Sequence, residues 1–435
     1  MKTPNDAVHH HIEHASAALT EGRVDDLLRH ARLAADLAPF DDPALHMRVA
    51  SVLQAAFRFS GAPEMFDRAL AECVAVGNRT AHPEWAIPAR ALAGNVLMLA
   101  GRLYQAVEYC DAALALATAC QLESDRVSSM AHQFRGYVLM EWNQLDAARD
   151  ALMAAWSIAS ERDRGVRSGV ARVMAELELA CGDLPSAHRW SETLAGIVIE
   201  PMTLRNREWL AAVRARHGFA VTRDLRELDA WQRRHDYRLD VLEQLPDAAI
   251  TARLHECEHL LTMLETTSQW TALGQLGAII ERGARPMRVG YLLRALTARA
   301  LACEASGAAD DALALWLTAL ELGEVGGFVR VYTDGSPLRL RLLRRAAQHP
   351  RGHAHARRVL GAAGEHVAGE EPVHLTDRQR DVLRLVASGM SDREISGATG
   401  LSVATVKTHL RAVYERLDVR SRTAAVAKAS AAGLV

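Results

Sequence analysis

Apolar residues recur along most of this 435-residue chain at spacings of three and four positions, the period that gives an α-helix one apolar face. The pattern comes in units, each made of an apolar helix end, a small or turn residue, and a second helix rich in Ala and Leu. A period of about forty residues is typical of stacked helix pairs, each of which buries its apolar face against the next. The clearest turns fall at Gly22, Gly101, Gly182 and Gly307, and weaker copies turn at Gly61, Asn143 and near Ser268.

The pattern therefore predicts a tetratricopeptide-like α-solenoid of roughly seven helical hairpins. Charged residues interrupt it between residues 197 and 262, so it predicts no helix boundaries there. Residues 328–332 (FVRVY) have the period of a strand, but an isolated strand has nothing to pair with. We expect this segment to pack irregularly against the last repeat helix.

Composition agrees with an all-α fold, because 49% of the residues are apolar, only 5% are aromatic, and Ala and Leu dominate. The six cysteines form no CxxC pair, so we expect reduced core residues in a cytoplasmic protein. No apolar run is long enough for a signal peptide or a membrane span, and we expect no membrane partner. The net charge of −2 indicates no polyanionic partner, so any such signal must be local.

The local signals of helix ends are densest after residue 375. Thr376 and Gln379 form one capping box, Ser391 and Glu394 form a second, and Ser402 is placed to cap a third helix. A fourth helix is expected after Ser421, while Gly389 and Gly400 are placed to end the first and second helices. Residues 361–374, rich in Gly, Ala and acidic residues, have no apolar period. We therefore expect a repeat domain over 1–346, a linker over 347–373 and a C-terminal domain over 374–435.

The third of these helices has two faces. Val403, Val406, Leu410, Val413 and Leu417 fall at spacings of three and four and predict its buried side. The opposite side then carries Ala404, Lys407, Thr408, Arg411 and Glu415. A short helix, a tight turn and a longer helix are typical of the helix-turn-helix, whose second helix enters the DNA major groove. Residues 375–435 carry 10 Lys and Arg against 6 Asp and Glu, a modest excess of the sign that DNA attracts.

The last 60 or so residues resemble the LuxR-type helix-turn-helix domain in the motifs LTDR, GMSDREI, SVATVKTH and LDVRSRTAAV. The resemblance implies that Lys407, Thr408 and Arg411 meet bases or nearby phosphates, and that Arg393 and Thr405 contact the DNA backbone. It also implies a homodimer formed through the last helix. The residues at that dimer contact are Arg422, Thr423 and Val426.

The sequence departs from the LuxR-type pattern at four positions. Gln379 and Asp381 replace usual glutamates, Asp392 replaces an asparagine, and Thr399 stands where a core leucine is expected. Thr399 is expected to loosen its helix, and Asp392 puts a negative charge near DNA.

Residues 327–338 (GFVRVYTDGSPL) resemble the junction that precedes this domain in MalT-like activators, large ATP-binding LuxR regulators. No lysine occurs between Lys2 and Lys407, so the chain has no GxxxxGK[ST] phosphate loop and we expect no cofactor.

Other motifs have two interpretations each. His9, His10, His11 and His14 suggest a metal site, but a frayed N-terminus is the simpler reading and we predict no metal. Residues 349–358 (HPRGHAHARR) are either a contact with DNA phosphates or linker, and we favour linker. The C-terminal helices alone are also consistent with a small bundle that ends the solenoid. Four tryptophans, Trp142, Trp156, Trp270 and Trp316, are expected in the solenoid core.

The sequence carries no GxSxG, HExxH or other catalytic pattern, so we predict no catalytic residues and no enzyme. The leading hypothesis is a transcription regulator that binds double-stranded DNA in a sequence-specific manner. Its helical repeats are predicted to sense a small molecule or a partner protein, since solenoids present concave binding surfaces, although a passive dimerisation scaffold fits them too. The alternative is an interaction adaptor whose DNA contact is secondary, which Thr399 and Asp392 favour. The sequence identifies neither the signal nor the operator.

Overall fold

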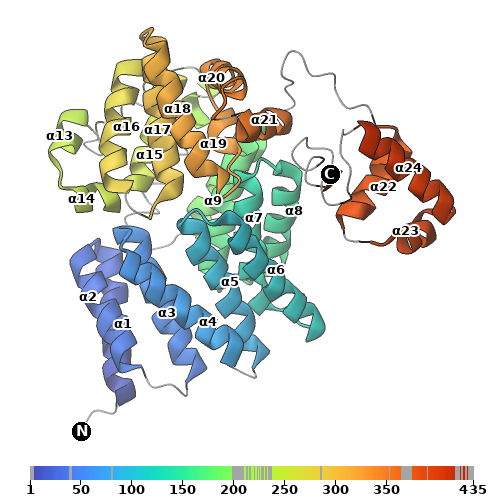
Figure 1. Cartoon of the computed structure of the whole chain (residues 1–435). Coiled ribbons are helices and arrows are strands. Elements are labelled where there is room, and N and C mark those ends of the chain that lie inside the picture. The colour runs from blue at the N-terminus through green and yellow to red at the C-terminus, as the bar shows by residue number, and fades with distance from the viewer. Residues whose placement is uncertain are drawn as a thin grey trace. The chain divides into compact units, whose positions relative to one another are not determined.

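The protein is described from a computed structural model, and its described part consists of helices, turns and short connections (Figure 1). No strand occurs among the described residues, in agreement with the predicted all-α class. The structure describes residues 4–38, 42–79, 82–197, 238–284, 287–351, 353–363, 375–388 and 390–416, with scattered positions between 210 and 233 and between 422 and 429.

Seven helical hairpins make up most of the repeat region, as the sequence predicts. Their helices are α1 (Pro4–Glu21) and α2 (Val24–Leu37), α3 (Pro43–Ser60) and α4 (Pro63–Arg79), α5 (Pro83–Leu99) and α6 (Leu103–Ala119), α7 (Arg126–Glu141) and α8 (Leu145–Ile158), α9 (Arg164–Cys181) and α10 (Leu184–Ile197), α15 (Leu254–Thr266) and α16 (Trp270–Ala284), and α17 (Val289–Ala305) and α18 (Ala309–Glu324). The short helices α13 (Leu239–Gln244) and α14 (Asp247–Ala252) precede α15, and α19 (Arg330–Thr333) follows α18.

The predicted turn residues are confirmed at every hairpin. The backbone has a positive φ, between 58° and 85°, at Gly22, Gly61, Gly101, Asn143, Gly182, Ser268 and Gly307. A left-handed residue ends a helix and reverses the chain within a few residues, which brings the second helix back along the first.

Small residues let the paired helices approach closely. A Cβ added to Gly94 of α5 would lie 2.9 Å from the carbonyl oxygen of Ala106 in α6, and one added to Gly136 of α7 would lie 2.7 Å from Leu152 in α8. Ala and Leu then fill the interface, with Ala113, Ala148 and Leu152 fully buried. The apolar stripe read from the sequence is the core of the solenoid.

Contacts between distant hairpins close the repeat region on itself. The indole Nε1 of Trp142, at the end of α7, donates a hydrogen bond of 2.9 Å to the carbonyl oxygen of Gly326. The amide of Val329 donates to the carbonyl oxygen of Glu141 over 3.1 Å, and the Arg294 guanidinium of α17 pairs with the Glu141 carboxylate at 2.8 Å. In Figure 1, α19 accordingly lies beside α7.

Residues 328–332 form part of this closure, but not as an irregular segment, and that expectation was wrong. Their C-terminal part is the helical turn α19, and Phe328, Val331 and Tyr332 are buried. The Tyr332 hydroxyl donates to the carbonyl oxygen of Ala319 in α18 over 2.6 Å, so the expected packing against the last repeat helix is confirmed. Adjacent residues of a strand point to opposite faces, whereas the helical turn α19 buries the adjacent side chains of Val331 and Tyr332.

The first helix and the cysteines differ from two further expectations. The run of histidines is not frayed: it lies in α1, which begins at Pro4 and buries Val8, Ile12 and Ala15, an apolar stripe interleaved with the histidines. Three of the six cysteines are buried, but Cys120 and Cys181 are exposed, so not all are core residues. Trp316 is fully buried as expected, whereas Trp142 and Trp156 are partly buried beside the core and Trp270 is half-buried.

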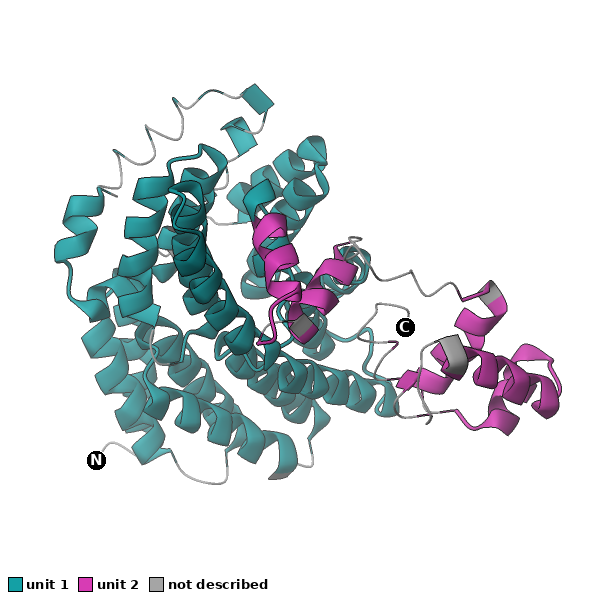
Figure 2. Ribbon diagram, turned by 45° about the horizontal axis from the view of Figure 1, so that its top comes forward, with its two compact units in different colours: residues 1–338 teal, residues 339–435 magenta. Residues whose placement is uncertain are grey.

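The chain divides into two compact units, residues 1–338 and residues 339–435 (Figure 2). The first contains the seven hairpins. Part of the segment expected to be linker forms the helix α21 (His353–Ala362), which buries Ala356, Val359 and Leu360. The second unit contains most of α20 (Pro337–Ala347), α21 (His353–Ala362), α22 (Asp377–Ala387), α23 (Asp392–Thr399) and α24 (Val403–Arg416).

Candidate functional site

The helices α22 and α23 each begin with the predicted capping box. The Thr376 hydroxyl accepts a hydrogen bond from the Gln379 amide at 3.3 Å, and the Gln379 side chain accepts one from the Thr376 amide at 3.0 Å. The same exchange joins Ser391 and Glu394, at 3.4 and 2.7 Å. Hydrogen bonds from the Ser391 amide and hydroxyl lower the pKa of the Glu394 carboxyl, so the helix start is best held when this group is ionised.

The turn between α23 and α24 is tight and held by side chains. Gly400 ends α23 with φ 69°, as predicted. The Ser402 hydroxyl accepts from the Thr405 amide at 3.1 Å and caps α24, and the Ser396 hydroxyl donates to the Leu401 carbonyl at 2.6 Å. The predicted end of α22 at Gly389 lies outside the described residues, and α22 itself ends at Ala387. These bonds fix where α24 starts relative to α23.

The two faces of α24 lie as the sequence predicts. Val406, Leu410 and Val413 are buried, and Val406 and Leu410 pack with Ile395 of α23 and Val382 of α22. Val403 is half-buried, and neither the Glu415 side chain nor Leu417 is among the described residues. The side chains exposed on the opposite face are Ala404, Lys407, Thr408 and Arg411.

Each predicted contact residue has a definite place in this domain. Arg393 is exposed in the first turn of α23, next to the cap. The Thr405 hydroxyl lies 2.8 Å from the Ser402 hydroxyl, and the Thr408 hydroxyl donates to the Ala404 carbonyl at 3.0 Å. The Thr408 hydroxyl is thereby held against the α24 backbone and the Thr405 hydroxyl against the capping side chain of Ser402, and both retain acceptor lone pairs.

The last predicted helix is described only at scattered residues. The Arg422 guanidinium pairs with the Asp392 carboxylate at 2.8 Å and also donates to the Met390 carbonyl. Val426 packs against the cluster that contains Val406 and Leu410, and Thr423 lies outside the described residues. The negative charge of Asp392 therefore has a cation partner within the same domain.

Thr399, the other departure from the family pattern, is half-buried at the end of α23. Its hydroxyl donates to the Ile395 carbonyl at 2.7 Å, one turn earlier in the same helix. The polar side chain is thus satisfied by the helix that it ends.

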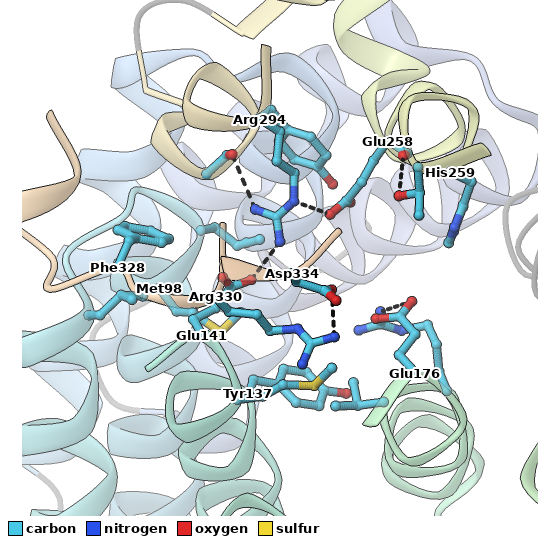
Figure 3. A pocket seen from close by; sticks show the side chains of 18 of the residues that line it. Met98, Tyr137, Glu141, Glu176, Glu258, His259, Arg294, Phe328, Arg330 and Asp334 are labelled. Carbon is cyan, nitrogen blue, oxygen red and sulfur yellow. Dashed lines mark hydrogen bonds and ion pairs between the residues drawn. The ribbon is translucent and has the colours of Figure 1, made fainter. Parts of the chain in front are cut away.

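A pocket of about 220 Å³ lies within the first unit, where the closing contacts gather, and the sequence did not predict it (Figure 3). Its lining includes Tyr137 and Glu141 of α7, Arg172 of α9, and Glu258 of α15. Aromatic rings and charges of both signs in one small space can bind a small polar molecule. Further lining residues are Tyr291 and Arg294 of α17, Phe328 and Arg330.

Arg294 organises the charges of this pocket. Its guanidinium lies between two carboxylates, at 2.8 Å from Glu141 and 2.5 Å from Glu258 (Figure 3). Burial alone would lower the pKa of Arg294, but the two carboxylates outweigh burial and the pKa is raised. The second oxygen of Glu141, Oε2, is shielded from solvent and accepts no hydrogen bond from the described residues.

Four histidines meet at the first hairpin. Nδ1 of His11 in α1 lies 2.9 Å from Nδ1 of His30 in α2, and the ring centroids of His14 and His30 are 5.0 Å apart. The rings of His10 and His14 are also in contact. The described residues contain no group of three ligands placed to hold a metal ion.

The folds of the two units and the exposed cationic face of α24 define a helical-repeat protein with a helix-turn-helix DNA-binding domain. Residues 9–349 match the family described as "MalT-like TPR region", and residues 373–429 match "Bacterial regulatory proteins, luxR family". The chain belongs to the family with a MalT-like TPR region, and it carries a C-terminal DNA-binding domain of the LuxR family.

The similar proteins share this C-terminal domain. YhjB of Escherichia coli (strain K12), which is named as an HTH-type transcriptional regulator, is 47% identical over 51 residues, 12% of this chain and 26% of YhjB. The response regulator protein VraR of Staphylococcus aureus (strain NCTC 8325 / PS 47) is 42% identical over 52 residues, 12% of this chain and 25% of VraR. The chain thus spans about a quarter of the length of these relatives. Within the described residues, no helix has the length and apolar character of a membrane span.

Proposed function

We propose that this protein is a transcription regulator that reads a specific DNA sequence with α24 and receives its signal through the helical repeats. The observation that carries the proposal is the exposed face of α24, which presents a small residue, Ala404, ahead of Lys407 and Arg411. A small residue lets a helix approach the base edges, and Lys or Arg can reach guanine O6 and N7 or a phosphate. The domains proposed are a sensing domain over 1–346 and a DNA-binding domain over 374–435.

The proposed contacts with DNA are of two kinds, those with bases or nearby phosphates and those with the DNA backbone. Lys407, Thr408 and Arg411 are proposed to meet bases or nearby phosphates, while Arg393 and Thr405, at the starts of α23 and α24, are proposed to contact the backbone. Helix starts present unpaired amides, and together with hydroxyl and guanidinium donors these bind phosphate. All five residues lie on or beside the two helices of the helix-turn-helix.

A dimer through the last helix is proposed, with half-sites about one helical turn, ~34–36 Å, apart. The proposed contact residues are Arg422, Thr423 and Val426. Since Arg422 and Val426 also contact their own domain, their replacement is expected to affect both the domain and the dimer. Sedimentation of the parent with and without a palindromic operator measures this association; a single half-site bound by a monomer would contradict it.

The pocket around Arg294 is the proposed effector site for a small molecule. Its lining comes from helices of several hairpins, among them α7, α9, α15 and α17, so a bound molecule changes how tightly the repeat region closes. Mass spectrometry of small molecules released from purified parent and Arg294→Gln tests this. We expect the purified parent to release a bound compound that Arg294→Gln does not retain. If the parent releases no compound and residues 1–346 capture a protein instead, the result favours partner sensing.

Selection of bound fragments from genomic DNA tests the proposed function itself. We expect the parent to enrich one sequence motif. Lys407→Ala and Arg411→Ala are each expected to bind it ~1–3 kcal/mol more weakly. Arg384→Ala is the matched control, because it removes one exposed cation from α22 instead of α24. An unchanged affinity in the α24 variants would overturn the assignment of the reading face.

The adaptor alternative makes a different prediction, namely a stoichiometric protein partner that is still captured after deletion of the last 60 residues. The two residues that favoured it have partners within the domain: Asp392 pairs with Arg422, and the Thr399 hydroxyl bonds to the Ile395 carbonyl. These contacts support an intact DNA-binding domain.

A further inference from the structure

The segment between the repeats and the LuxR-type domain is strongly basic. Residues 335–364 contain seven arginines and three histidines but no Asp or Glu. In a chain whose net charge is −2, thirty residues without one acidic side chain are a local excess of the kind that attracts a polyanion. The arginines are Arg339, Arg341, Arg344, Arg345, Arg351, Arg357 and Arg358.

The structure orders this segment as helices α20 and α21, each with a buried and an exposed side. In α20, Leu342 and Leu343 are fully buried, while Arg341 and Arg344, three positions apart, are exposed on one face. Residues three apart on a helix are neighbours, so these two guanidinium groups project together. Helical order lowers the entropy lost when such side chains bind a partner.

The second helix, α21, also carries an exposed arginine beside buried apolar residues. Arg357 is exposed on α21, whose Val359 and Leu360 are buried, and Arg351 is exposed in the turn that leads into α21. The helices are joined by only a few residues, and both views of the protein place them near each other (Figures 1 and 2). Together their four exposed arginines, Arg341, Arg344, Arg351 and Arg357, form what we call the basic shoulder.

The basic shoulder changes the charge of the unit that contains the DNA-binding domain. Residues 339–435 carry 17 Lys and Arg against 9 Asp and Glu, a net charge of +8, whereas residues 1–338 carry 34 against 44, a net charge of −10. The LuxR-type part alone, residues 375–435, accounts for +4. Half of the positive charge of this unit therefore lies outside the helix-turn-helix.

We infer that the basic shoulder is a second DNA contact, which binds backbone phosphates while α24 reads bases. The inference rests on the proposed DNA-binding function. Arginine binds phosphate through two parallel N–H donors, and such contacts raise affinity without reading sequence. Because the shoulder and α24 lie on one chain, DNA held by one is at high effective concentration for the other. The arginines of the shoulder also interact within the chain, so phosphates share or replace those contacts.

The salt dependence of binding measures phosphate contacts directly. For duplex DNA the slope of log Kobs against log salt concentration is about −0.9 per phosphate neutralised. We therefore expect the full-length double variant Arg341→Ala/Arg344→Ala to bind with a slope smaller in magnitude by about 2 for each bound protomer, or about 4 for the proposed dimer. Two lost contacts correspond to roughly 60-fold weaker binding at 0.1 M salt, relative to affinities that converge near 1 M. Arg351→Ala/Arg357→Ala is expected to behave in the same way.

The probes are a random-sequence duplex and the fragment recovered by genomic selection, both of the same length. The matched control is Arg162→Ala/Arg164→Ala, which removes two exposed arginines from the repeat region. Arg341→Lys/Arg344→Lys keeps the charge and is expected to keep the slope. Thermal melting of every variant identifies any that fails to fold.

The outcomes separate the two proposals. Shoulder variants that lower the slope on both duplexes, and leave the ratio of specific to non-specific affinity unchanged, support the inference. A slope equal to that of the parent in both double variants overturns it, and so does an equal change in the Arg162/Arg164 control. If the parent shows no sequence preference, the proposed function fails, while the slope on the random duplex still tests the shoulder.

Discussion

The closed repeat region makes one glycine much less replaceable than its equivalents in other hairpins. Gly101, in the turn between α5 and α6, has φ 79°, and a Cβ added there would lie 2.5 Å from the Cβ of Val289 in α17. Carbon atoms in contact are ordinarily ~3.5–4.0 Å apart. Because the Cβ of Val289 is fixed to its backbone, Gly101→Ala requires a shift of about 1 Å between two hairpins that are distant in sequence.

The expected loss of stability has two parts. A left-handed conformation costs a residue with a Cβ ~1–2 kcal/mol, and forcing an extra carbon into a packed contact costs ~1–3 kcal/mol. Gly101→Ala is therefore expected to lower the free energy of unfolding by ~2–5 kcal/mol. Gly307→Ala, in the turn of α17 and α18, has φ 85° and nothing within 4 Å of the added Cβ, so only the first part applies.

Urea denaturation of the two variants gives the difference between them, and hydrogen exchange locates it. Gly101→Ala is expected to speed exchange at the start of α17 and around Gly326, whose own added Cβ would lie 2.4 Å from the carbonyl oxygen of Gly101. Equal losses of stability in the two variants, with no change of exchange in α17, would refute the closed arrangement of the repeats.

Three further predictions concern single side chains. Arg294→Gln leaves two carboxylates without their cation, and urea denaturation is expected to show a free energy of unfolding lower by ~1.5–3 kcal/mol. Burial and neighbouring positive charges lower the pKa of His30, so the fold favours the neutral form of this side chain. The resulting contribution to stability is complete above pH 6.5 and is lost as the pH falls further. Melting curves of His30→Gln should therefore depend less on pH than those of the parent. Val406→Ala removes two methyl groups from a fully buried side chain and is expected to destabilise the DNA-binding domain by ~2–3 kcal/mol in circular dichroism melts, and an unchanged melt would contradict the packing of α24.

Features encoded by neighbouring residues could be predicted from the sequence. The seven turns, both capping boxes and the faces of α24 depend on side chains within about four positions of one another, where propensity and hydrogen bonding decide the structure. The exposed side of α24 follows from Val406 and Leu410 alone, because their burial fixes where Lys407 and Arg411 point.

Features encoded by distant residues could not be predicted in this way. Trp142 meets Gly326 across 184 positions, and the pocket combines Tyr137 with Arg294 from another hairpin. Neither pair produces a periodic pattern of apolar and polar residues in the sequence. The wrong expectation of a frayed segment has a different cause, since histidines interrupt the apolar stripe that begins at Val8 and orders α1. The helix α21 was not predicted because its apolar face is short and polar residues surround it.

The central claim is that the exposed face of α24 reads DNA sequence. The ratio of affinities for the genomically selected fragment and for a random duplex, measured at one salt concentration, tests it most directly. We expect a ratio of ~10³ or more for the parent and a fall of at least roughly 30-fold in Lys407→Ala/Arg411→Ala, with Arg384→Ala unchanged. A double variant that discriminates as well as the parent would contradict the account.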